Sequence, residues 1–140
     1  MDKTFYITTP IYYPSAKPHM GHAYSSIIAD FFARFKIIDD YQVYFLTGTD
    51  EHGLKIQRSA EKVGKEPLAF CDQISLTFRD LSDTLNLSNT DFIRTTEERH
   101  KKTVQHLWNE LEKNDDIYLS NYSGWYSVCL LYTSDAADES

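Results

Sequence analysis

The sequence predicts an α/β domain built on parallel strands. Short apolar, β-branched runs alternate with longer stretches of helical periodicity, in the order strand, helix, strand, helix. This alternation favours parallel strands joined by right-handed crossovers. In open sheets of this kind, ligands bind beyond the carboxyl ends of the strands. The loops that follow the strands are therefore where we expect the functional residues.

The first half of the chain supplies two strands and two helices. The expected strands are Phe5–Ile11 and Tyr41–Thr47, and the expected helices are Ala23–Ile38 and Leu54–Val63, with Gly64 as the C-terminal cap of the second helix. Four large apolar residues at helical spacing are predicted to give the first helix its core stripe, namely Ile28, Phe31, Phe32 and Phe35.

The second half continues the alternation. Pro67 is expected to open a third helix, and Asp91–Thr95 is expected to form a short strand. Thr96 is the expected N-cap of a helix that runs to Lys113. The third helix has an apolar stripe of Cys71, Ile74, Phe78, Leu81 and Leu85. The residues of the last helix that are predicted to lie in the core are Val104, Leu107, Trp108 and Leu111. Two more short strands are expected, at Ile117–Leu119 and Trp125–Val128.

Length and composition exclude several classes of protein. The 140 residues, with 41% hydrophobic and 25% charged residues, suit one globular domain with its own core. A net charge of −7 argues against broad nonspecific binding of nucleic acid. No apolar run reaches membrane-spanning length, and the first residues show no signal or transit pattern, so a cytoplasmic protein without membrane contact is expected. Cys71 and Cys129 form neither a disulfide framework nor a zinc knuckle.

The run His19-Met20-Gly21-His22 is the most informative motif. It stands where the first strand hands over to a helix N-terminus, a place that favours phosphate oxygens, and Gly21 leaves the backbone open to a flat ligand. A nucleotide is the ligand to expect. Two other interpretations stay open on this motif alone, a pair of solvated surface histidines or half of a metal site.

A second polar loop, Gly48–Gly53, follows the second strand, and the topology brings it to the same crevice as the histidines. Asp50 suits a substrate ammonium group, or equally an Asx-turn or helix cap. Glu51 is expected on a solvated face, and His52 either lines the pocket or holds the loop. A metal site built from His19, His22, Asp50 and His52 is a further alternative, although the sequence gives these residues no tight ligand spacing. Neither a Gly-x-Gly-x-x-Gly fingerprint nor a P-loop is present.

Six segments together resemble the N-terminal part of the methionyl-tRNA synthetases, a family of class I aminoacyl-tRNA synthetases. They are Thr9–Pro14, His19–His22, Thr47–Gly53, Asp91–Thr96, Glu98–His100 and Gly124–Val128. The tyrosine-rich entry combined with the Gly-Thr-Asp-Glu-His-Gly loop is specific within the class. The resemblance implies the first half of a Rossmann-like, HIGH-type nucleotidyl transferase domain with a parallel sheet.

The resemblance also implies roles for individual residues. His19 and His22 match the signature histidines that bind ATP and stabilise the adenylation transition state, and Gly21 matches the glycine on which adenine packs. Ile11, Tyr13 and Asp50 match residues that bind methionine. ATP would bring Mg²⁺ with it, no protein-bound zinc is expected in this chain, and tRNA would bind through parts that the chain lacks.

The implied activity is ATP-dependent activation of methionine to methionyl-adenylate and its transfer to tRNA, in a longer parent protein. The family's Lys-Met-Ser-Lys-Ser motif is absent here, so these 140 residues alone are expected to be inactive. The expected division is 1–116 for the catalytic half-domain, 117–128 for the start of a connective insertion, and 129–140 for a foreign tail. Two alternatives stay open, a small nucleotidyltransferase with the same histidine signature and an inactive nucleotide-binding fragment.

Overall fold

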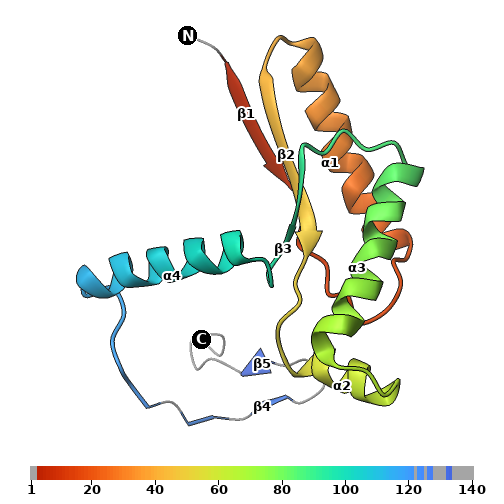
Figure 1. The fold of residues 1–140 in the computed structure, drawn as a ribbon. Helices are drawn as coiled ribbons and strands as arrows, with labels where there is room; N and C mark the ends of the chain where they lie inside the picture. The colour runs from red at the N-terminus through yellow and green to blue at the C-terminus, as the bar shows by residue number, and fades with distance from the viewer. Residues whose placement is uncertain (1–2, 122, 125, 128–131, 134–140) are drawn as a thin grey trace. The chain divides into compact units, whose positions relative to one another are not determined.

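The computed structural model describes residues 3–121, 123, 124, 126, 127, 132 and 133, and it divides the chain into two units, 1–104 and 105–140. The first unit holds β1 (Thr4–Thr8), α1 (Met20–Ile38), β2 (Gln42–Thr49), α2 (Leu54–Lys62), α3 (Pro67–Thr84) and β3 (Asp91–Arg94) (Figure 1). Helix α4 (Glu98–Lys113) begins in the first unit and ends in the second, which also holds β4 (Tyr126–Ser127) and β5 (Tyr132–Thr133).

The first unit is built on a three-stranded parallel sheet with the order β1-β2-β3. Phe5 of β1 pairs with Val43 of β2, and Gly48 of β2 pairs with Ile93 of β3. Helix α1 connects the first two strands, whereas α2 and α3 connect the second and third, and α1 and α3 lie against the same face of the sheet (Figure 1). The parallel α/β fold predicted from the alternation is confirmed.

Helix α1 packs on the sheet through small residues. Ala29 and Ala33 are buried against Phe45 of β2, and Ala23 and Ser26 continue the same stripe. The predicted core stripe is wrong, because the side chains of Ile28, Phe31, Phe32 and Phe35 are 40%, 64%, 47% and 54% exposed. The alanines let the helix approach the strands closely, so the large side chains turn to the opposite side, where no other described element buries them.

Helix α3 carries the predicted stripe into the core. Cys71 packs with Ile56 and Phe70, while Phe78 packs with Tyr12, and Ile74 contacts both clusters. The predicted start and end signals are also confirmed, since α3 begins at Pro67 and Gly64 directly follows Val63, the C-cap residue of α2. Gly64 has a φ of 64°, and Lys65 N–H donates to the carbonyl of Ala60 over 3.0 Å, which is the glycine-based helix end that the sequence predicts.

Two predictions about α4 are wrong. The helix begins at Glu98 and the carbonyl of Glu97 accepts the first N–H groups, so Thr96 is not its N-cap; the Thr96 hydroxyl donates instead to Glu51. The helix buries none of its residues, and Val104, Leu107 and Trp108 are 48%, 58% and 56% exposed, because no described residue covers this apolar face.

The predicted strand at Ile117–Leu119 is not a strand in the structure. The next predicted strand is observed in part, at Tyr126–Ser127, while Trp125 and Val128 lie outside the described residues. Most of the predicted foreign tail, 129–140, also lies outside them. Among the helices that the structure describes, none combines the length and the apolar character that crossing a membrane requires.

Strand β2 extends two residues further than the sequence indicates, so that Gly48 and Thr49 belong to the strand and not to the following loop. A Cβ atom at Gly48 would lie only 2.0 Å from the carbonyl oxygen of Ile93 on β3. The close approach of the two strands therefore requires glycine at this position.

Candidate functional site

The two signature histidines lie at the N-terminus of α1. His19 is the N-cap residue and its Nδ1 accepts a hydrogen bond from Gly21 N–H over 3.0 Å, while Nδ1 of His22 accepts one from the backbone N–H of His19 over 3.0 Å. The two rings stack with their centroids 3.8 Å apart. The histidines therefore cap the helix reciprocally, as Ser and Glu do in a capping box.

These hydrogen bonds fix the chemistry of both rings. An Nδ1 that accepts a hydrogen bond is unprotonated, so the neutral ring carries its proton on Nε2. Burial lowers the pKa of His22, and the neighbouring His19 lowers it further. With each Nδ1 accepting a backbone N–H, the helix N-terminus presents two Nε2–H donors, which suits an anionic ligand.

Gly21 keeps the His19 ring in place. A Cβ atom at this position would lie 2.9 Å from Cε1 of His19 and 3.1 Å from its Nδ1. Any other residue would push the imidazole out of its capping position. The glycine between the histidines thus has a structural reason that is independent of any ligand.

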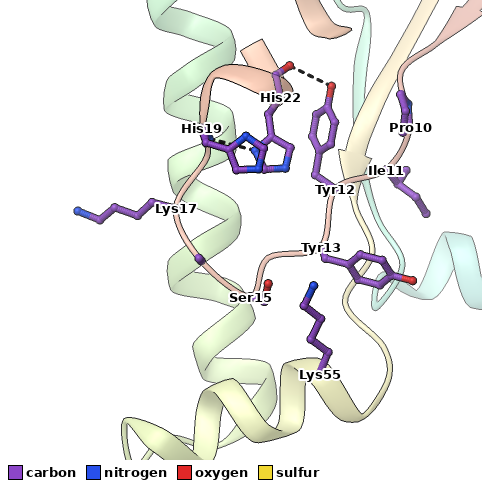
Figure 2. Close-up of a pocket in the computed structure, with 10 residues that line it drawn as sticks. Pro10, Ile11, Tyr12, Tyr13, Ser15, Lys17, His19, His22 and Lys55 are labelled. Atoms are coloured by element: carbon purple, nitrogen blue, oxygen red, sulfur yellow. Dashed lines mark hydrogen bonds between the residues drawn. The ribbon is translucent and has the colours of Figure 1, made fainter. Parts of the chain in front are cut away.

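The histidines line a cavity of about 380 Å³, a volume in the range of small-molecule sites (Figure 2). Its lining contains four basic side chains, those of Lys17, His19, His22 and Lys55, and no carboxylate. This is a local excess of basic groups in a chain whose net charge is −7. Sequence reasoning missed both lysines; Lys55 stands two residues after Gly53, at the start of the helix that follows the second loop.

The remaining wall of the cavity comes from the segment after β1. Its lining residues there are Pro10, Ile11, Tyr12, Tyr13, Ser15 and Ala16. Ile11 and Tyr13 are 39% and 50% exposed, and the Lys55 ammonium lies 5.6 Å from the centre of the Tyr13 ring (Figure 2). Tyr12 stands between these two residues in the sequence and is buried, and its hydroxyl lies 3.0 Å from Oγ of Ser26 on α1. Ile11 and Tyr13 therefore face the cavity while Tyr12 anchors the segment to the core.

Asp50 lies at the same end of the sheet but follows β2 instead of β1. Tyr12 N–H donates to the carbonyl of Gly48 over 2.9 Å, and Asp50 N–H donates to the carbonyl of Tyr12 over 2.9 Å. The end of β2 thus runs beside the segment that holds Ile11 and Tyr13. Asp50 is half-buried but is not one of the residues that line the cavity of the histidines.

Glu51 is the residue that sequence reasoning misplaced. The expectation of a solvated side chain is wrong, because its side chain is fully buried and makes a two-pronged ion pair with Arg94, with Nε–Oε1 and Nη2–Oε2 distances of 2.7 and 2.9 Å. The hydrogen bond to Glu51 raises the pKa of Arg94 above its ordinary value, although burial opposes the shift. The signal available in the sequence was Arg94 itself, a lone cation at the end of a buried strand.

His52 and Cys71 lie beside this ion pair. Nε2 of His52 is 3.1 Å from the carbonyl oxygen of Thr95, and His52 lines a separate hollow of about 390 Å³ with Glu51, Leu54 and Pro67 among others. Burial, together with Glu51, raises the pKa of the Cys71 thiol to about 11. Within the described part of the chain, no three metal-ligating side chains gather closely enough to hold a metal ion.

Comparison with known proteins places this geometry in a family. The family model described as tRNA synthetases class I (M) matches residues 5–136. The mitochondrial methionine–tRNA ligase of Takifugu rubripes is 55% identical over 127 residues, which cover 91% of this chain and 22% of that protein. The methionine–tRNA ligase of Mesorhizobium japonicum is 53% identical over 124 residues, covering 89% of this chain and 24% of that protein.

A solved structure agrees with the sequence comparisons. Methionyl-tRNA synthetase of Mycobacterium tuberculosis, in complex with methionyl-adenylate, superposes with a TM-score of 0.90 at 46% identity, over 96% of this chain and 26% of that chain. The chain thus spans roughly a quarter of the length of these relatives, and its parallel sheet is that of their Rossmann-like catalytic domain. The match over nearly the whole chain shows that it belongs to the class I aminoacyl-tRNA synthetases of the methionine type.

Proposed function

We propose that this chain forms the half of a methionine–tRNA ligase active site that binds the phosphates of ATP and the amino group of methionine. The observation that carries the proposal is the pair of Nε2–H donors in the lining of a cavity that has basic groups and no carboxylate. The overall reaction activates methionine with ATP and transfers it to tRNA(Met), in a longer protein that supplies the tRNA contacts. The proposed location is the cytoplasm, although the Takifugu relative is named as mitochondrial.

In the first step the methionine carboxylate attacks the α-phosphorus of ATP. A new bond forms between carboxylate oxygen and phosphorus, the bond to the β-phosphate oxygen breaks, and pyrophosphate leaves with Mg²⁺ that arrived with ATP. His19 and His22 donate Nε2–H hydrogen bonds to the phosphate oxygens as charge develops there. Gly21 would provide the surface for adenine, and Lys55 would add positive charge within the cavity.

The methionine would lie at the strand ends. Ile11 and Tyr13 line the cavity and would contact the amino acid, while Asp50 would pair with its ammonium group. His52 lines a different hollow and would act on the loop, through its contact with Thr95, more than on the ligand. No zinc is proposed in this chain. Residues 1–116 are proposed as the catalytic half-domain and 117–128 as the start of an insertion.

The test uses a full-length methionine–tRNA ligase that carries residues 4–121 of this chain in place of its own. His19→Ala or His22→Ala should slow methionine-dependent ATP–pyrophosphate exchange by roughly two to three orders of magnitude, with little change in methionine affinity. His106→Ala, an exposed histidine on α4, is the matched control. An exchange rate near that of the parent in both signature variants would refute the assigned role, and exchange without methionine would favour a nucleotidyltransferase.

Asp50→Asn in the same protein should weaken methionine binding by about 2–5 kcal/mol and leave ATP binding largely intact, because an unpaired ammonium would remain in a desolvated pocket. Calorimetry with each ligand separately measures both affinities. A selective loss of ATP affinity would show that Asp50 serves the phosphates or their metal ion instead.

A further inference from the structure

Glu51 is a buried carboxylate for which the proposed reaction has no use. Its side chain has no exposed surface, and both carboxylate oxygens accept hydrogen bonds from other residues. Oε1 accepts hydrogen bonds from Thr49 Oγ1 over 2.8 Å and from Arg94 Nε over 2.7 Å, and Oε2 accepts from Arg94 Nη2 over 2.9 Å and from the Thr96 hydroxyl. The main chain is bound as well, since Glu51 N–H donates to Thr95 Oγ1 over 2.8 Å. The residue is thus held at every polar atom of its side chain.

The partners of Glu51 come from separate parts of the fold. Thr49 ends β2, Arg94 ends β3, and Thr95 and Thr96 follow it. Asp72 on α3 pairs at 2.6 Å with Nη2 of Arg94, the nitrogen that also donates to Glu51. One carboxylate and one guanidinium therefore connect two strand ends and a helix. These are the strand ends at which ligands bind in a parallel sheet.

The network lies directly beside Asp50. Asp50 is fixed on one side by its N–H bond to the Tyr12 carbonyl and on the other by Glu51, and His52 is held by the Thr95 carbonyl. Within the described residues, the Asp50 carboxylate makes no hydrogen bond or ion pair of its own. The loop thus holds its backbone rigidly and leaves one carboxylate available to a ligand.

Stability alone does not account for this arrangement. A buried ion pair recovers little more than the cost of removing its charges from water, and an apolar pair of similar volume often stabilises a fold as well. Directional bonds from four side-chain donors give something that an apolar pair cannot give, which is a single orientation of the loop.

We propose that Glu51, held by Arg94, is a positioning residue that fixes the Asp50 carboxylate at the methionine site. This inference rests on the proposed function of Asp50. A misplacement of a binding group by about 1 Å can cost up to about a hundredfold in rate. Loss of the network should therefore raise KM for methionine much more than KM for ATP.

The experiment measures KM for methionine and for ATP in the full-length ligase carrying residues 4–121. Glu51→Gln keeps the shape but weakens the pair with Arg94, and it should raise KM for methionine roughly tenfold or more while KM for ATP changes less than about twofold. Thr96→Val, which removes a single hydrogen bond to Oε2, is the milder variant and should shift the same constant in the same direction.

Asp30→Asn is the matched control. Asp30 on α1 is a similarly enclosed carboxylate, bonded to Arg34 and to the N–H and hydroxyl of Ser88 at 2.6 Å each, but it touches neither loop. This variant should lower stability without changing the ratio of the two KM values. The positioning role would be overturned if Glu51→Gln raised both KM values equally. It would also be overturned if Asp30→Asn changed the ratio of the two KM values as much as Glu51→Gln does.

A second measurement separates this inference from the proposed function. Amide hydrogen exchange of the 140-residue chain should accelerate at residues 50–52 in Glu51→Gln, and not in Asp30→Asn, whereas β1 and β2 stay protected. Unchanged exchange at residues 50–52 overturns the inference. If His19→Ala abolishes activity while Glu51→Gln leaves KM for methionine unchanged, the proposed function stands and the inference is wrong.

Discussion

The loops that follow β1 and β2 use their polar side chains in opposite ways. After β1, two imidazoles use one nitrogen each to cap α1 and keep the other nitrogen available at a cavity. After β2, the polar atoms of the Glu51 side chain all bond to other residues of the protein, whereas the Asp50 carboxylate has no partner among the described residues. The first loop is thus built to offer donors, whereas the second is built to hold one acceptor still.

This difference predicts a difference in how the two loops respond to substitution. The partners of Glu51 cannot be replaced by water, because its side chain is fully buried. His19 lies at an exposed helix end, where water can take over its bond to the backbone. Changes at Glu51 should therefore cost stability as well as methionine binding, whereas changes at His19 should cost mostly function.

The largest expected effect is that of Glu51→Ala. It leaves the Arg94 guanidinium largely buried with one partner fewer, and it should reduce the free energy of unfolding by about 3–5 kcal/mol. Urea unfolding of the chain followed by circular dichroism measures this loss. The double variant Glu51→Leu with Arg94→Met should recover much of it, and a single variant as stable as the parent would break the comparison.

Gly48→Ala tests the strand that leads into the second loop. The added Cβ would lie 2.0 Å from the Ile93 carbonyl oxygen, so β2 and β3 must separate, at a cost of about 1–3 kcal/mol in unfolding free energy. The control is Gly64→Asn, since Asn tolerates the positive φ of this helix end and should change stability much less. A Gly48→Ala protein with parental stability and strand protection would contradict the close approach.

The sequence predicted the sheet better than it predicted burial. Alternation and turn residues sufficed for the parallel strands, because these depend on local patterns and on connection lengths. The pattern of α1 shows that it has an apolar side but not which partner covers that side, so Phe31 and Phe35 were assigned to the core while Ala29 and Ala33 occupy it. Burial depends on what packs against a face, and this chain spans only about a quarter of its relatives.

The same reasoning explains the outcome at the site. His19, Gly21 and His22 form a contiguous motif whose local geometry follows from capping, and the structure brings them together. Glu51 was misjudged because its partner, Arg94, is 43 residues away and joins it only through the pairing of β2 with β3. Lys55 was missed because its place at the cavity depends on the turn of α2 beneath Tyr13.

His19→Ala should have a small effect on stability. The variant removes the side chain that accepts the Gly21 N–H at the helix N-terminus, and loss of such a cap costs about 0.5–1 kcal/mol. Urea unfolding should show this modest change, with His19→Asn restoring the cap and the stability. If Asn restored adenylate formation in the full-length ligase as well, the ring would serve the helix alone, and the contrast between the two loops would disappear.

The smallest expected effect is a dependence of stability on pH through His22. Burial and the neighbouring His19 lower the pKa of His22 below its ordinary value of 6.5, so the unfolded chain binds a proton more readily than the folded one. The contribution of the neutral His22 ring to the free energy of unfolding is complete above pH 6.5. It is lost as the pH falls through that value toward the lower pKa of the folded state. Unfolding free energies at pH 7.5 and 5.5 should differ less in His22→Gln than in the parent, while His106→Gln should leave the difference unchanged. Added tripolyphosphate should reduce the loss at pH 5.5, because an anion at the Nε2–H donors favours the charged imidazole. If His22→Gln and the parent showed the same pH dependence, the His22 ring would be as exposed to water in the folded chain as in the unfolded chain.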